Sequence, residues 1–286
     1  MKLPLDFGPL GAYYVDLPNI TEAQFTNIEE EFKPLINSPQ LKSREAIARA
    51  FELAIRMCPA ENPSDLWHHV LYRIYCRVKI GTNPQQSWVR TSGEALEMFF
   101  ASLYNPILAN YGLRLVSLIS GPEKLRILSR MGIADKVGSR KIDMSIEKKG
   151  DPRGAVDGYG VIGGLHIKAS LAERVSDDIP ASRVMMSAGF ESMLLTLDVK
   201  SFPPLAALGF DQNIRRLINI GEFGTPERPS DKRRYVENHG DFTAGFSYNS
   251  RTIHSPEETA SGRRIFVVDP SSQPDPFVRY LVGCSG

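Results

Sequence analysis

Lys141-Ile-Asp-Met-Ser-Ile-Glu147, with Val161-Ile-Gly-Gly-Leu-His-Ile-Lys168 after it, decides the fold. The first stretch alternates polar and apolar residues, which predicts a half-buried strand, and the second is an apolar run that predicts a buried strand. If the two strands pair, the carboxylate of Asp143 and the ammonium of Lys168 converge at one edge of a sheet. A carboxylate can hold Mg²⁺ and a lysine can hold or polarise a water, so the pair suits metal-assisted phosphodiester hydrolysis.

The bulk composition is that of an ordinary globular protein. The chain has 286 residues, of which 42% are hydrophobic and 23% charged, so it can bury a large core. Its net charge is +1, so the protein is not globally basic. This balance makes nucleic-acid binding less expected without excluding it, because basic residues can line a single cleft.

Cysteine usage and the N-terminus favour a reducing compartment. Cys58, Cys76 and Cys284 are far apart and form no C-x-x-C pair, which argues against a zinc site or a disulfide framework. The N-terminal residues lack the apolar core of a signal peptide, and no run is long enough to span a membrane. The sequence therefore predicts a cytoplasmic protein with no membrane partner.

The hydrophobic period changes near the middle of the chain. The first half predicts helices from Thr21 onward and over 43–57, 64–75, 92–104 and 121–131. The second half predicts strands over 140–147, 161–169, 193–199, 243–248 and 264–268, with helices over 181–191 and 231–238. This order predicts an α/β core with an N-terminal helical layer. We expect one domain over 1–286, mainly helical over 1–135 and α/β over 136–286.

A third element gives the Asp143–Lys168 pair more weight. Arg90-Thr-Ser-Gly-Glu-Ala-Leu-Glu97 reads as a helix start, with Ser92 as the N-cap and Glu94 near the positive end of the helix dipole. Simple capping explains Glu94 but not Glu97, which lies one turn further on. Without such a third group, Asp143 and Lys168 read equally well as solvated residues or as a structural ion pair.

These residues resemble a known family. A glutamate on an N-terminal helix, an aspartate on one strand and a lysine on the next is the order in PD-(D/E)xK nucleases, notably type II restriction endonucleases. The segment from Thr91 to Glu97 is similar to that of enzymes cutting CCGG-type sites. The resemblance covers roughly residues 90–200 and implies a restriction-endonuclease-like mixed β-sheet flanked by helices.

The resemblance also implies an active site and a partner. Asp143 would bind Mg²⁺, together with the main-chain carbonyl of Ile167, and Lys168 would position the attacking water. Glu97 would support a second metal or orient the lysine. The substrate would be double-stranded DNA, and the enzyme would act as a homodimer, with the N-terminal helices supplying dimer contacts.

The sequence departs from the family pattern at the second acid. Ile142 stands where the family has proline, and His166 stands where its second carboxylate usually lies. Some members carry this carboxylate on the following helix, but counting from Lys168 leads to Ala181-Ser182. Asp177 and Asp178 are nearer and Glu191 is farther, so the second acid stays unassigned. His166 either takes part in catalysis as a ligand or is a hydrogen-bonded structural histidine.

The segment after Lys168 is the best candidate for reading bases. In the resembling enzymes a Glu-Arg pair just past the lysine reads bases, and Glu173-Arg174 stands there. Asp177, Asp178 and Arg183 extend the set, because arginine can bond guanine and acids can accept from cytosine. The alternative is a plain helix start, with Ser176 or Asp178 as the cap and Pro180 at the first position.

Two other functions stay open at this stage. The irregular second acid favours a non-catalytic nucleic-acid-binding protein with a nuclease-like core. A metabolic α/β enzyme with a structural Asp143–Lys168 ion pair is the third. Nucleotide-binding loops and the serine-hydrolase motif are absent from the sequence.

Overall fold

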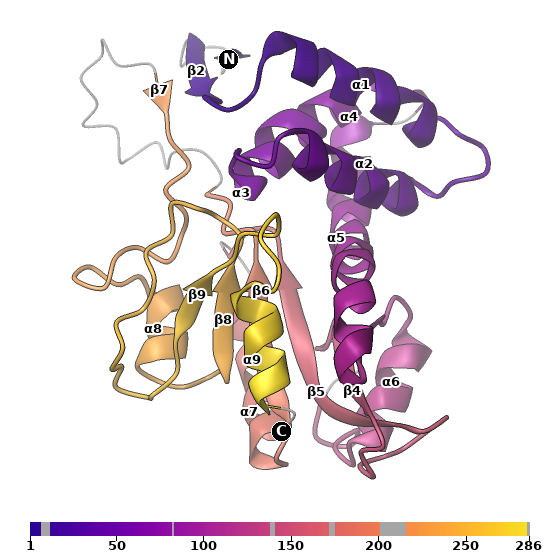
Figure 1. Cartoon of the computed structure of the whole chain (residues 1–286), viewed down its shortest axis with the longest axis vertical. Helices are drawn as coiled ribbons and strands as arrows, with labels where there is room; N and C mark the ends of the chain where they lie inside the picture. Colours follow the sequence, from indigo (N-terminus) through magenta and orange to yellow (C-terminus); the bar gives the residue numbers. More distant parts are fainter. Residues whose placement is uncertain (7–11, 82, 138–140, 172–174, 201–215, 285–286) are drawn as a thin grey trace.

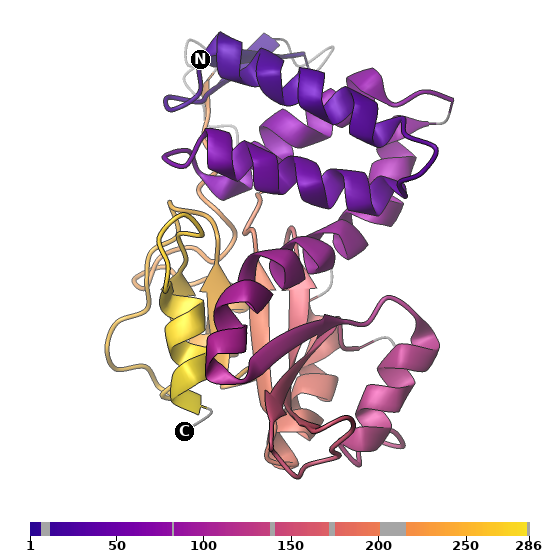
Figure 2. The ribbon, with the colours of Figure 1, turned by 45° about the vertical axis from the view of Figure 1, so that its right-hand side comes forward.

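The computed structural model describes residues 1–6, 12–81, 83–137, 141–171, 175–200 and 216–284 (Figure 1). The N-terminal part holds a hairpin and a layer of helices: β1 (Lys2–Asp6), β2 (Ala12–Asp16), α1 (Glu22–Ile36), α2 (Ser43–Met57), α3 (Pro63–Asp65), the π-helical turn η2 (Leu66–Leu71) and α4 (Tyr72–Val78). The long helix α5 (Pro84–Leu108) leaves this layer and runs across one face of the central sheet (Figure 2).

The remaining elements build the sheet and its other helices. They are η3 (Ala109–Tyr111), β3 (Leu113–Ser117), α6 (Gly121–Arg130), β4 (Met144–Lys149), β5 (Tyr159–Lys168), α7 (Val175–Ser187), β6 (Glu191–Thr196), β7 (Arg216–Leu217), α8 (Asp231–Glu237), β8 (Ala244–Ser247), β9 (Ile265–Val267) and α9 (Pro276–Cys284). Strand β7 pairs with β2 rather than with the central sheet.

The central sheet is mixed, in the order β3-β4-β5-β6-β8-β9. The pairs β3–β4 and β4–β5 are antiparallel, and the strands from β5 to β9 are parallel. Met144, at the start of β4, therefore lies opposite Leu165 near the end of β5. This register places Asp143 at the carboxyl edge of the parallel strands, where open α/β sheets commonly bind their ligands.

Helices cover both faces of this sheet. Leu165, Ile167 and Met193 pack into one core with α5, α9 and the N-terminal helices. On the opposite face, α6 and α7 pack with Ile142 and Val161 in a second cluster, and α8 covers β6 in a third. The mixed sheet flanked by helices and the helical N-terminal layer confirm the predicted fold class. The division at residue 135 stays a prediction.

Two glycines in β5 allow close packing around the site. A Cβ added to Gly163 would lie 2.6 Å from the carbonyl oxygen of Glu191 on β6. A Cβ on Gly164 would lie 2.5 Å from Met185 of α7 and 2.7 Å from Ile142. Gly163 thus lets β6 lie close to β5, and Gly164 lets α7 pack directly against β5.

The structure corrects several predicted boundaries. Helix α5 begins at Pro84, with Asn83 as its N-cap, so the predicted start at Ser92 was wrong. The helix predicted over 181–191 is present as α7, but it spans Val175–Ser187, so Pro180 lies inside the helix instead of at its first position. The sequence missed β1, β2, β3, β7 and α9. The strands predicted at 140–147, 161–169, 193–199, 243–248 and 264–268 and the helix at 231–238 are present, with shifted ends.

The three cysteines are free thiols. In the described part of the chain, no helix is both long and apolar enough to cross a membrane.

A buried polar network joins the helical layer to the sheet. The side-chain amide of Asn62, before α3, donates to Asn249 after β8 at 2.8 Å. Asn249 in turn donates to the carbonyl of Asp198, which follows β6. The carboxyl group of Asp198 accepts from the backbone N–H of Glu222 and the hydroxyl of Thr252. Burial raises the pKa of Asp198 to about 7, against the opposing effect of these hydrogen bonds.

Stability should therefore fall as the pH rises from about 4 to about 7. The folded protein keeps the Asp198 proton in this window and the unfolded chain releases it, so the folded state loses a few kcal/mol across it. Asp198→Asn should remove this part of the slope, since asparagine tolerates the φ of +50° found there. Urea unfolding of both proteins at a series of pH values measures this, with the exposed Asp135→Asn as control. Parallel slopes for wild type and Asp198→Asn would contradict it.

Candidate active site

Asp143 and Lys168 meet at the carboxyl edge of β5. The ammonium of Lys168 lies 3.3 Å from Oδ2 of Asp143. The backbone holds the carboxylate in place: Asp143 N donates to the Leu165 carbonyl at 3.0 Å, and Ile167 N donates to Oδ2 at 2.8 Å. The predicted convergence of the two side chains is confirmed as geometry, and the main chain of β5 itself orients the carboxylate.

A second lysine, which sequence reasoning missed, contacts the same carboxylate. Lys124 of α6 places its ammonium 3.3 Å from Oδ1 of Asp143. Helix α6 starts beside the site because Leu118 N, just after β3, donates to the Asp143 carbonyl at 3.0 Å. Burial alone raises the pKa of Asp143, but Lys168, Lys124 and the Ile167 N–H outweigh it and hold that pKa below its usual value. Asp143 is thus a carboxylate at neutral pH.

Asp178 of α7 joins the same cluster from the other side of Lys168. Its Oδ2 lies 2.9 Å from the Lys168 ammonium, and the residue is 5% exposed. Lys168 therefore bridges two carboxylates. Burial lowers the pKa of Lys168, but Asp143 and Asp178 more than offset this and raise the pKa above its usual value. Lys168 is consequently a fixed cation rather than a base.

His166 lies behind Asp178 and away from solvent. The ring is fully buried, with Nε2 3.1 Å from the Ser192 hydroxyl and Nδ1 3.9 Å from Asp178 Oδ2. Phe242 packs edge-on against the ring. Burial lowers the pKa of His166 despite the nearby Asp178 and Asp143, so the imidazole is neutral at neutral pH. This environment fits the structural alternative, a buried histidine that is hydrogen-bonded to Ser192.

Glu97 approaches the cluster from α5. The residue is 7% exposed, and its Oε2 has no hydrogen-bond partner in the described structure. Burial, reinforced by the negative charge of Asp143, raises the pKa of Glu97 to about 9. The carboxyl group is therefore protonated at neutral pH before any further cation arrives.

The chain after Lys168 is fixed up to the segment that was predicted to read bases. The carboxylate of Glu222 accepts hydrogen bonds from the Ser170 hydroxyl at 3.2 Å and from Leu171 N. Burial raises the pKa of Glu222, against these hydrogen bonds. Glu173 and Arg174 lie outside the described residues. Glu222 is a second residue that the sequence alone did not reveal.

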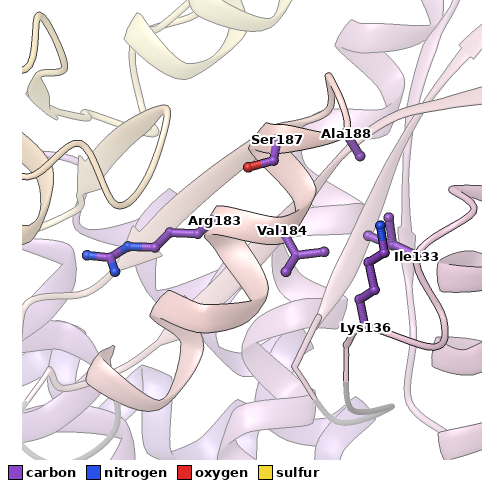
Figure 3. Close-up of a pocket in the computed structure, with 6 residues that line it drawn as sticks. All are labelled: Ile133, Lys136, Arg183, Val184, Ser187 and Ala188. Atoms are coloured by element: carbon purple, nitrogen blue, oxygen red, sulfur yellow. The ribbon is translucent and has the colours of Figure 1, made fainter.

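The other base-reading candidates lie on the outer side of α7. Asp177 is exposed, with Oδ2 3.9 Å from the Lys141 ammonium. Arg183 is also largely exposed and pairs with Asp241 at 2.6 Å. Arg183 borders a pocket of about 320 Å³ lined also by Ile133, Lys136, Val184, Ser187 and Ala188 (Figure 3). In this view Arg183 extends away from Lys136, and none of the catalytic candidates lines the pocket.

The donor set fits a divalent cation. Among the described residues, no group of three or more His, Cys, Asp or Glu side chains could hold a metal. Mg²⁺ needs fewer, because it keeps several waters and commonly binds one or two carboxylates together with phosphate oxygens. Asp143 and Asp178 are two such carboxylates. The unpartnered Oε2 of Glu97 beside them agrees with a cation site nearby.

Comparison with known proteins places the chain in a family. The model of the BsaWI restriction endonuclease type 2 family matches residues 120–269. The type II restriction enzyme AgeI of Thalassovita gelatinovora is 57% identical over 283 residues, 99% of each chain. The crystal structure of the specific restriction endonuclease AgeI–DNA complex superposes with a TM-score of 0.91, at 57% identity and over 99% of both chains.

The family match covers the whole candidate site apart from Glu97. Type II restriction endonucleases generally use a divalent metal, which agrees with the two carboxylates of the site. The chain therefore belongs to the type II restriction endonucleases, and it is a site-specific deoxyribonuclease that hydrolyses phosphodiester bonds.

Proposed function

We propose that this enzyme cuts a specific double-stranded DNA sequence with Mg²⁺ held by Asp143, Asp178 and the Ile167 carbonyl. One observation carries the proposal: Lys168 bridges two carboxylates at the carboxyl edge of β5, on the face that α7 and α6 close. A fixed cation between two metal-type ligands is an arrangement suited to stabilising a phosphoryl group under attack.

The charge of each residue determines its role in the proposed reaction. Lys168 stays an ammonium, so it orients the attacking water and neutralises charge on the phosphate rather than removing a proton. Asp143 and Asp178 are anchored by the backbone of β5 and by Lys168, so their oxygens need little reorganisation. The neutral ring of His166 lies behind Asp178 and is fixed by its contact with Ser192. When bound, the metal supplies Lewis-acid stabilisation and lowers the pKa of a coordinated water.

DNA reading and assembly complete the proposal. Glu173 and Arg174, directly after the segment held by Glu222, would read bases, together with Asp177 and Arg183 on the exposed side of α7. A CCGG-type site is palindromic, and the two-fold symmetry of a homodimer matches such a site. The buried position of Asp178 favours a metal-binding role over the base-reading role that the sequence suggested. A cytoplasmic location belongs to the same proposal.

A digest of phage genomic DNA tests this function. We expect discrete fragments with Mg²⁺ and intact DNA with EDTA, and sequencing of the fragment ends gives the site. The Lys136→Gln variant, which removes one exposed lysine outside the site, serves as a control and should give the same DNA fragments as the wild-type enzyme. Intact DNA with every divalent ion tried would contradict the proposal and favour a protein that binds DNA without cutting it.

Glu97→Gln should slow cleavage without weakening the fold. Glu97 is already neutral in the metal-free protein, so an amide of the same shape keeps the packing and the unfolding temperature. The amide cannot ionise to support a cation beside Asp143, and residues in such supporting positions typically contribute roughly 10–100-fold to metal affinity or activity. Single-turnover cleavage rates and thermal unfolding measure both effects.

Glu94→Gln is the control for this change. Glu94 lies one turn earlier on α5 and pairs with Arg44 at 2.6 Å, outside the cluster. A Glu97→Gln enzyme that cleaves as fast as Glu94→Gln would remove Glu97 from the site.

A further inference from the structure

The two carboxylate oxygens of Asp143 have different partners. Oδ2 accepts from Ile167 N at 2.8 Å and from Lys168 at 3.3 Å. Oδ1 faces the ammonium of Lys124 at 3.3 Å. Oδ1, which neither the Ile167 N–H nor Lys168 contacts, is therefore covered by the ammonium of Lys124 from helix α6.

We propose that Lys124 is a placeholder for the divalent metal: its ammonium occupies Oδ1 of Asp143 until a metal displaces it. Lys124 thereby sets the metal concentration that the enzyme requires. The inference rests on the proposed function, because it takes Asp143 as a metal ligand.

The charge balance of the cluster favours such an exchange. Two carboxylates, Asp143 and Asp178, face two ammonium groups, Lys124 and Lys168. A divalent ion added beside both lysines would leave like charges in contact in a largely buried site, which is costly. Ionisation of Glu97 offsets part of this charge, but the Lys124 ammonium and the metal would still compete for Oδ1 of Asp143.

Lys124 is the lysine able to leave. Among the described residues it forms one ion pair, to Asp143, whereas Lys168 is held by both carboxylates. The Lys124 side chain is 13% exposed, so it has a path to solvent, and a lysine stem is flexible. Helix α6 itself can stay in place, because Ile127 and Leu128 are buried and Ser120 with Glu123 forms a capping box.

A purely structural ion pair makes a different prediction. If Lys124 only fastened α6 to β4, its removal would lower stability and leave the intrinsic metal affinity unchanged. A placeholder instead competes with the metal. A cation at this distance lowers the pKa of a carboxyl group by roughly 1–3 units, because it stabilises the ionised form. A metal ion that binds the same oxygen must overcome the same attraction.

Calorimetric titration of the DNA-free protein with Mn²⁺ separates the two. We expect Lys124→Gln to bind Mn²⁺ at least roughly tenfold more tightly than wild type. Lys124→Arg keeps the charge and should bind as wild type does. Lys136→Gln removes an exposed lysine beyond the same helix and should also match wild type. The Mg²⁺ concentration for half-maximal cleavage should fall in Lys124→Gln by a similar factor.

Wild-type Mn²⁺ affinity in folded Lys124→Gln overturns the inference. Lys124→Met keeps the apolar stem and replaces Lys124→Gln if thermal unfolding shows the latter to be unfolded. Asp143→Asn shows whether only the placeholder role of Lys124 is wrong or the proposed metal site as well. If Asp143→Asn abolishes binding while Lys124→Gln changes nothing, only the placeholder role is wrong. If Asp143→Asn binds Mn²⁺ as wild type does, the metal site of the proposed function is itself wrong.

Discussion

Asp143→Asn is expected to lower the cleavage rate by about a thousandfold or more while the protein stays folded. Asp143 is the group on which Lys124, Lys168 and the Ile167 N–H converge, and the amide replaces a charged ligand with a neutral one. Metal-ion catalysis supplies several kcal/mol of transition-state stabilisation, and each 1.4 kcal/mol or so corresponds to a factor of ten in rate. Single-turnover cleavage with enzyme in excess measures the loss.

Two controls make the result specific to the site. The exposed Asp135→Asn carries the same chemical change at a distance and should cleave normally. Gel-shift binding of a duplex with the mapped site, in Ca²⁺, should show that Asp143→Asn still recognises its sequence. Near wild-type cleavage by Asp143→Asn would remove Asp143 from the active site, whatever the family resemblance implies.

Asp178→Asn should lower the cleavage rate by roughly 10²–10³-fold and leave the choice of DNA site unchanged. The reason is that Asp178 holds Lys168 at 2.9 Å and is buried, so its loss frees the lysine and removes a proposed metal ligand. The magnitude is that of removing one preorganised charge-stabilising group from an active site. The measurement is kcat/KM on the cognate site and on sites that differ by one base pair.

The comparison of cognate and altered sites decides between two roles for Asp178. A base-reading residue would lose about 1–3 kcal/mol of discrimination at one base pair with kcat preserved. Such a selective loss would return Asp178 to the recognition set and leave the second acid unassigned again.

The part of the site that follows local patterns was predictable from the sequence. Alternation around Asp143 and the apolar run ending at Lys168 predicted both strands. The structure pairs these two strands antiparallel. Asp178 was harder, because its role depends on where α7 begins. Counting from Lys168 by the spacing of the family led to Ala181-Ser182, whereas the helix already begins at Val175 and Asp178 is its buried acid.

Lys124 was beyond sequence reasoning for a different reason. It reaches Asp143 only because β3 pairs with β4 and delivers α6 to the same edge, a non-local consequence of the register Ser117–Met144. The start of α5 is the opposite case, because the local signal was present: Asn83-Pro84 is a strong cap, but the predicted start was at Ser92.

The position of the bound metal tests the account most directly. Crystals of the protein with a duplex carrying its mapped site, soaked in Mn²⁺, would locate the ion by anomalous scattering. We predict a peak within about 2.5 Å of a carboxylate oxygen of Asp143 and of a scissile phosphate oxygen, with the Lys124 ammonium moved off Oδ1. A metal bound away from Asp143 and Asp178, with both lysines still paired to them, would contradict the central claim.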